Sequence, residues 1–147
     1  MLSTYLTAVC ALLTSAGIGA NSVRSCSDVT DTVKDTIIRT VEAEVPTLEW
    51  NEVFFPYAQQ YGINGKKPHP EENYIYLKKK GEFVGNATLD EMATTVLDSV
   101  TEETKQALRS NPGNRIYACV AIHCDKTEHT PISLEVACIS TVATMQN

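Results

Sequence analysis

Apolar residues recur at helical spacing soon after the first charged residue of the chain. Five of them stand four positions apart, namely Val29, Val33, Ile37, Val41 and Val45. This spacing places all five side chains on one face of a helix. Serine and aspartate side chains precede the pattern and Pro46 follows it, so the sequence predicts a helix over residues 27–44.

A second amphipathic pattern predicts a longer helix over residues 89–110. Thr88 and Glu91 form a capping box, in which each side chain satisfies the backbone N–H of the other. The apolar stripe that follows consists of Leu89, Met92, Val96 and Val100. The sequence Asn-Pro-Gly-Asn at residues 111–114 ends the helix.

The region between these two helices has weaker patterns. Residues 52–61 predict a short helix, although Pro56 weakens that assignment. Residues 62–73 have the composition of a loop, with two glycines and two prolines. Residues 74–77 predict a short strand.

Two strands are predicted at the C-terminal end, over residues 115–124 and 132–142. The turn-prone segment 125–131 joins them as a hairpin. Helices that precede a terminal hairpin indicate an α+β architecture, and 147 residues suit a single domain.

The first twenty residues predict a cleaved secretory signal. Residues 1–20 hold no charged side chain, an apolar run covers residues 5–13, and small residues follow it. The run is too short to span a bilayer as a free helix. A basic residue near Met1 is missing, so an uncleaved membrane anchor or a buried N-terminal helix is the alternative. Cleavage leaves residues 21–147 as the mature domain.

Four cysteines stay in the mature domain, and an even count behind a signal predicts two disulfides. If the hairpin centre lies between residues 128 and 129, Cys119 faces Cys138 across the strands. That pairing leaves Cys26 for Cys124. The secretory context also gives meaning to Asn86-Ala-Thr88, which is an acceptor sequence for N-glycosylation at Asn86.

The charge of the chain argues against nucleic acid as a partner. The net charge is −6, and an acidic surface repels phosphate backbones. The one basic run comprises Lys78, Lys79 and Lys80, with Lys66 and Lys67 nearby. We interpret it as a solvated face; a heparin or anionic-lipid contact is the alternative.

Neither catalysis nor metal binding is expected. His123 adjoins Cys124, but neighbours on a strand point to opposite faces, and a cysteine in a disulfide is no nucleophile. The other candidate metal ligands nearby are Asp125, Glu128, His129 and Cys119, and none of them forms the tightly spaced pairs typical of zinc sites. We therefore expect no catalytic, metal or cofactor residues. Trp50, the single tryptophan, is interpreted as a core anchor, with a binding hot spot as the alternative.

The C-terminal sequence IYACVAIHC at residues 116–124, followed by LEVACIST at residues 134–141, resembles the closing hairpin of the CAP superfamily of cysteine-rich secretory proteins. It is more similar still to the SAG-type surface antigens of the coccidian parasite Eimeria. The shared features are an early cysteine, a tyrosine-rich stretch as at residues 73–76 and an amphipathic helix as at residues 89–108. Residues 88–91 lack the cysteine often found at the start of the long helix in this family, so one of three family disulfides is missing.

This resemblance implies a CAP-like α–β–α sandwich and a non-catalytic antigen that is secreted or displayed on the cell surface. Its partner would be a host-cell protein or glycan. No apolar tail suited to a GPI anchor follows Cys138, so membrane attachment stays open, as does the oligomeric state. The alternatives are a lipid- or sterol-binding CAP protein with a cavity lined by Trp50, Phe54 and Phe55, and a small hydrolase or metal-dependent enzyme.

Overall fold

The computed structural model describes residues 24–69, 74–110 and 115–142. In chain order, its elements are β1 (Cys26–Asp28), α1 (Thr30–Glu44), β2 (Leu48–Trp50), the 3₁₀ turn η1 (Glu52–Phe54), α2 (Phe55–Asn64), β3 (Tyr74–Phe83), α3 (Leu89–Asp98), α4 (Glu102–Ser110), β4 (Arg115–Cys124) and β5 (Ile132–Val142). The predicted signal at residues 1–20 and the turn at 111–114 lie outside the described residues.

The sheet is built around the predicted C-terminal hairpin. Its strand order is β1-β4-β5-β3, and β2 pairs with β4 in parallel. The bounds of β4 and β5 agree with the prediction, and the α+β class is confirmed. Both short strands lie on the edge of β4 that β5 leaves open: Cys26 faces Cys124 at one end, and Leu48 faces Arg115 at the other.

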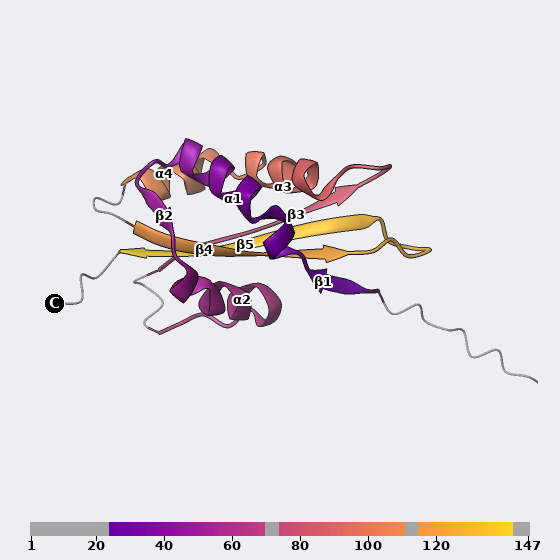
Figure 1. Cartoon of the computed structure of the whole chain (residues 1–147), viewed down its shortest axis with the longest axis horizontal. Helices are drawn as coiled ribbons and strands as arrows, with labels where there is room; N and C mark the ends of the chain where they lie inside the picture. The colour runs from indigo at the N-terminus through magenta and orange to yellow at the C-terminus, as the bar shows by residue number, and fades with distance from the viewer. Residues whose placement is uncertain (1–23, 70–73, 111–114, 143–147) are drawn as a thin grey trace, which may run out of the picture.

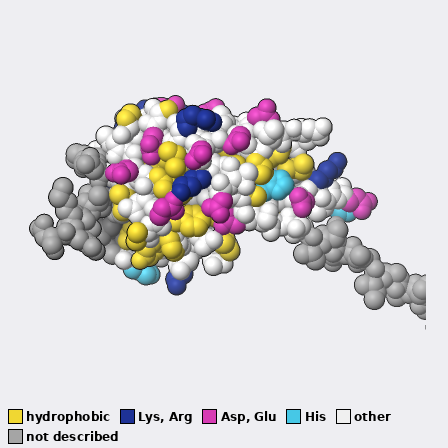
Figure 2. Space-filling view, in the orientation of Figure 1, with side chains coloured by type: hydrophobic (Ala, Val, Ile, Leu, Met, Phe, Trp, Pro, Cys, Tyr) yellow, Lys and Arg dark blue, Asp and Glu magenta, His cyan; other side chains and the backbone are white. Residues whose placement is uncertain are grey.

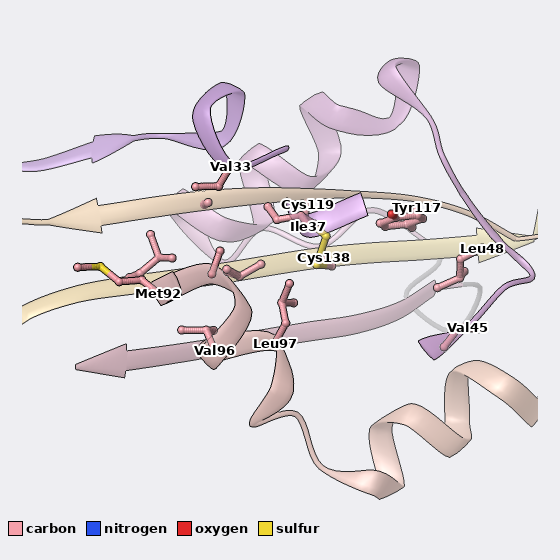
Figure 3. Close-up of a cluster of buried hydrophobic side chains, with 14 of the residues drawn as sticks. Val33, Ile37, Val45, Leu48, Met92, Val96, Leu97, Tyr117, Cys119 and Cys138 are labelled. Atoms are coloured by element: carbon pink, nitrogen blue, oxygen red, sulfur yellow. A yellow bond between two sulfur atoms is a disulfide. The ribbon is translucent and has the colours of Figure 1, made fainter. Parts of the chain in front are cut away.

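Helices cover both faces of this sheet. Helices α1, α3 and α4 lie on one face and α2 lies on the other (Figure 1). The larger core fills the space between the sheet and the group of three, with Val33 and Met92 toward one end and Val45, Leu48 and Tyr117 toward the other (Figure 3). A smaller cluster lies under α2 and contains Phe54, Ala58, Ala118 and Ile139.

Helix α1 begins at Thr30, three residues later than predicted, because residues 26–28 pair with β4 as a strand. Asp28 Oδ1 accepts a hydrogen bond from the Thr30 N–H at 2.9 Å, which marks the turn into the helix. Thr30 Oγ1 accepts a bond from the buried N–H of Ala121, also at 2.9 Å. The start of the helix thereby supplies a hydrogen-bond acceptor for β4 at Ala121, on the edge between the positions that pair with β1 and β2.

The predicted helix over residues 52–61 is a 3₁₀ turn followed by α2, which extends to Asn64. Pro56 lies in the first turn of α2, where the missing N–H costs nothing, so it does not break the helix. Gly65 ends α2 in the left-handed conformation, with φ at 66°.

Strand β3 is longer than the predicted strand over residues 74–77. It pairs with β5 along its whole length, from Tyr74 opposite Thr141 to Phe83 opposite Ile132. The lysine run is therefore part of an edge strand of the sheet, and period-2 alternation sends Lys79 to the face opposite Lys78 and Lys80.

The predicted helix over residues 89–110 is two helices. The capping box of Thr88 and Glu91 is present at the start of α3. Residues 99–101 separate the two helices; Ser99 Oγ donates to the carbonyl of Val96 at 2.7 Å, and Thr101 Oγ1 accepts from the Thr104 N–H at 3.4 Å. Thr101 thus caps α4.

Candidate functional site

An apolar pocket lies between α1, the α3–α4 pair and the sheet. Its cavity volume is about 50 Å³. The lining residues come from every layer of that half of the fold: Thr40, Val41, Glu44, Val45, Leu48, Ile75, Leu77, Leu97, Val100, Lys105, Leu108, Tyr117, Cys138 and Ser140. Most of these side chains are hydrophobic, so the pocket suits an apolar ligand.

Three strands form the floor of this pocket. Tyr117 on β4, Ser140 on β5 and Ile75 on β3 face one another in one row of the sheet. Tyr117 is 1% exposed, and its hydroxyl donates to Glu42 Oε1 at 3.4 Å. Burial is the main reason that the pKa of Tyr117 is raised well above its ordinary value, and the charge of Glu42 adds to the effect.

Ser140 contributes an unusual group to the floor. The residue is 3% exposed, and its Oγ has no hydrogen-bond partner within the described part of the chain. Buried hydroxyls nearly always have a partner, because leaving one unpaired costs free energy. The pocket lining therefore includes a buried hydroxyl, that of Ser140, with no hydrogen-bond partner among the described residues.

Charged side chains gather where the pocket meets α4. Glu44 on α1 pairs with Lys105 at 3.6 Å and with Arg109 at 3.1 Å, and Arg109 also pairs with Glu102 at 2.6 Å. Glu44 is 45% exposed, so these pairs lie at the solvent side of the pocket. Exposed pairs of this kind contribute about 0–1 kcal/mol each, so they hold α4 only weakly on α1.

The four cysteines in the described part of the chain form two disulfides, Cys26–Cys124 and Cys119–Cys138. Both pairs agree with the prediction, in which the hairpin register pairs Cys119 with Cys138 and leaves Cys26 for Cys124. Cys138 also lines the pocket. Because Cys124 is oxidised in this structure, it offers His123 no thiol to activate.

The structure does not bring the histidines into a metal site. His123 Nδ1 lies 3.7 Å from Asp125 Oδ1, while His69 and His129 are exposed. Within residues 24–69, 74–110 and 115–142, no three metal-ligating side chains converge.

The aromatic cluster does not form the cavity wall that was the alternative expectation. Phe54 and Phe55 belong to the cluster under α2, on the opposite face of the sheet from the pocket. Trp50 packs against both clusters and lies nearly perpendicular to the ring of Tyr117, with ring centroids 5.6 Å apart. It contacts a pocket residue without lining the pocket.

The lysine run does not form a continuous basic patch, because two of its lysines lie beside acidic side chains. Lys78 pairs with Glu135 at 3.2 Å and donates to the carbonyl of Gly62 at 3.1 Å, and Lys80 lies 3.9 Å from Glu82. The space-filling view likewise shows acidic and basic side chains interspersed over the visible face (Figure 2). This mixture of charges favours the solvated-face interpretation.

Asn86 is exposed, between β3 and α3. Its position leaves the side chain accessible, as N-glycosylation requires. Thr88, the third residue of the acceptor sequence, is the N-cap of α3.

The pocket itself was missed at the sequence level, because its residues are spread from position 40 to position 140. One signal was present. Ser140 stands two positions after Cys138 and so shares its core-facing side of a strand, where a polar residue needs an explanation.

None of the helices in the described ranges has the length and hydrophobicity needed to cross a membrane. Comparison of the chain with protein-family models, with curated proteins and with solved structures gave no match.

Proposed function

We propose that the protein is a non-catalytic, extracellular binding domain that holds a small apolar ligand in the pocket between α1, α4 and the sheet. The observation that carries this proposal is the concave wall of hydrophobic side chains around Ser140. Burial of apolar ligand surface there would supply the binding free energy. Two disulfides favour an oxidising compartment as the place of action.

Mass spectrometry of extracted protein tests the proposal directly. Protein purified from a eukaryotic secretory host is extracted with organic solvent, and the extract is searched for bound aliphatic compounds. We expect an apolar compound in the extract, or saturable binding of added 1-hexanol if the ligand is lost in purification.

A filling variant makes the test specific to the pocket. Val100→Phe adds volume to the pocket lining, which also contains Leu97 and Leu108, and should weaken 1-hexanol binding by about tenfold. Val53→Phe is the matched control, because Val53 is 83% exposed on η1 and is not one of the lining residues. Equal binding by both variants and the parent protein would contradict the proposal.

A second candidate function is that of a secreted or surface-displayed antigen in contact with a host-cell protein or glycan. The similarity to SAG-type antigens motivates it, and the CAP-like sandwich is part of the same proposal. Helices on both faces of the sheet, two disulfides and the exposed Asn86 are consistent with it. Labelled protein should bind host epithelial cells saturably, whereas reduced and alkylated protein should not.

A further inference from the structure

Ser140 Oγ is well placed to anchor a ligand. The hydroxyl is buried, belongs to a residue that lines the pocket and has no hydrogen-bond partner among the described residues. Alanine would fill the same position without an unpaired hydroxyl, so a serine here is costly unless something in the pocket bonds to it.

A lone water molecule is a poor partner for this hydroxyl. A buried water needs two to four polar partners. The neighbouring hydroxyl of Tyr117 is directed to Glu42, and the side chains around Ser140 are mainly hydrophobic. A molecule with one hydrogen-bonding group and an aliphatic remainder fits this arrangement better than water does.

The charge of the pocket favours a neutral ligand. Lys105 is the one cation among the lining residues, and it pairs with Glu44. A carboxylate beside Ser140 would lose its hydration without gaining a positive partner. A neutral alcohol has a smaller desolvation cost, because its hydroxyl can either donate to or accept from the serine hydroxyl.

The size of the pocket favours a short chain. A water-sized group needs about 10–15 Å³ of such space, so a cavity of about 50 Å³ holds only several of them. Helix α4 buries Leu108 alone and is tied to α1 by exposed ion pairs. A longer chain would therefore displace α4 outward.

We propose that the pocket binds a short, uncharged aliphatic alcohol, whose hydroxyl pairs with Ser140 Oγ and whose chain lies beneath α4. This inference rests on the proposed ligand-binding function and adds the chemical class of the ligand. Ser140 would thereby distinguish alcohols from hydrocarbons of the same length.

The test compares three compounds of equal chain length: 1-hexanol, 1-chlorohexane and hexanoate. Binding to the full protein is followed by NMR titration of the methyl groups of Leu97 and Val100. We expect 1-hexanol to bind most tightly. Ser140→Ala should weaken 1-hexanol binding by about three- to tenfold and leave 1-chlorohexane unchanged. The ratio of the two affinities within one variant is insensitive to any loss of folded protein.

Ser133→Ala is the matched control, because Ser133 is also buried on β5 but bonds to Arg24 and lies outside the pocket. It should leave the affinity ratio unchanged. If the compounds bind but Ser140→Ala keeps the ratio of the parent protein, or if hexanoate binds best, the alcohol assignment is wrong. If no compound binds the parent protein, the ligand-binding function itself fails.

Discussion

The rings of Trp50 and Tyr117 meet edge to face, with centroids 5.6 Å apart and planes at 86°. This contact connects β2 to the floor of the pocket, since Tyr117 lines the cavity and Trp50 lies outside it. Trp50 is the single tryptophan of the chain, so its fluorescence reports on the surroundings of one pocket residue.

Tyr117 should make the protein sensitive to alkali. Its pKa is raised in the folded state by burial and by Glu42, so its stabilising contribution is complete below the unfolded value of ~10 and is lost as the pH rises through the folded value. We expect the free energy of unfolding in urea to fall steeply above pH ~10.

Tyr117→Phe should flatten this decline, and Tyr57→Phe, at an exposed position, should not. The pKa of Tyr61 is also raised, by burial and by Glu135. Tyr61 should therefore cause part of the pH dependence of unfolding that remains in Tyr117→Phe. An unchanged slope in Tyr117→Phe would show that another group controls alkaline unfolding.

The two disulfides should be reduced in a fixed order. Cys26 is exposed, whereas Cys119 is fully buried between the sheet and the helices. A mild reductant should therefore open Cys26–Cys124 first, because exchange needs access to a sulfur. Alkylation with peptide mapping at successive times checks the order, and in denaturant the two bonds should react at similar rates.

Gly62 and Gly65 should respond to alanine for different reasons. A Cβ on Gly62 would collide with Val120 Cγ1 and lie 3.3 Å from Ala137 Cβ, so Gly62→Ala should cost about 1–3 kcal/mol by overpacking. Gly65 has open space around it but a φ of 66°, so Gly65→Ala should cost about 1 kcal/mol through backbone strain.

A double-mutant cycle separates the two causes. Val120→Ala removes the colliding methyl groups and should recover much of the loss in Gly62→Ala, but none of the loss in Gly65→Ala. Chemical denaturation of all five variants supplies the comparison. Additive losses at positions 62 and 120 would rule out the collision.

Thr88 combines two roles that substitution can separate. Its hydroxyl caps α3, and it completes the acceptor sequence of Asn86. Thr88→Ala should remove both the glycan and about 1 kcal/mol of stability. Thr88→Ser should keep both, while Asn86→Gln should remove the glycan alone. Intact mass and thermal unfolding of protein from a eukaryotic host distinguish these outcomes.

The hairpin was predictable because its signals are local: two apolar runs and a turn-prone segment fix the register that places Cys119 opposite Cys138. Strands β1 and β2 were not predictable. Each has only three residues, which is too short for a periodic pattern, and each forms only by pairing with β4, which is distant in the sequence. The break between α3 and α4 had a readable signal, since Thr101 precedes Glu102 and Glu103 as a helix start would. We nevertheless predicted one helix, because the apolar stripe of residues 89–100 extends to the break without interruption.

The pocket could not be predicted from the sequence, for a different reason. Most wall residues look like ordinary core positions, and the space among them arises only when α1, α4 and the sheet pack together.

The lysines of β3 have a consequence for the behaviour of concentrated protein. Strand β3 stands at the end of the strand order and pairs only with β5 among the described strands. If two molecules joined through this border, the charged side chains of Lys78, Lys80 and Glu82 would lose part of their hydration. The cost of desolvating these charges therefore discourages growth of one sheet into the next.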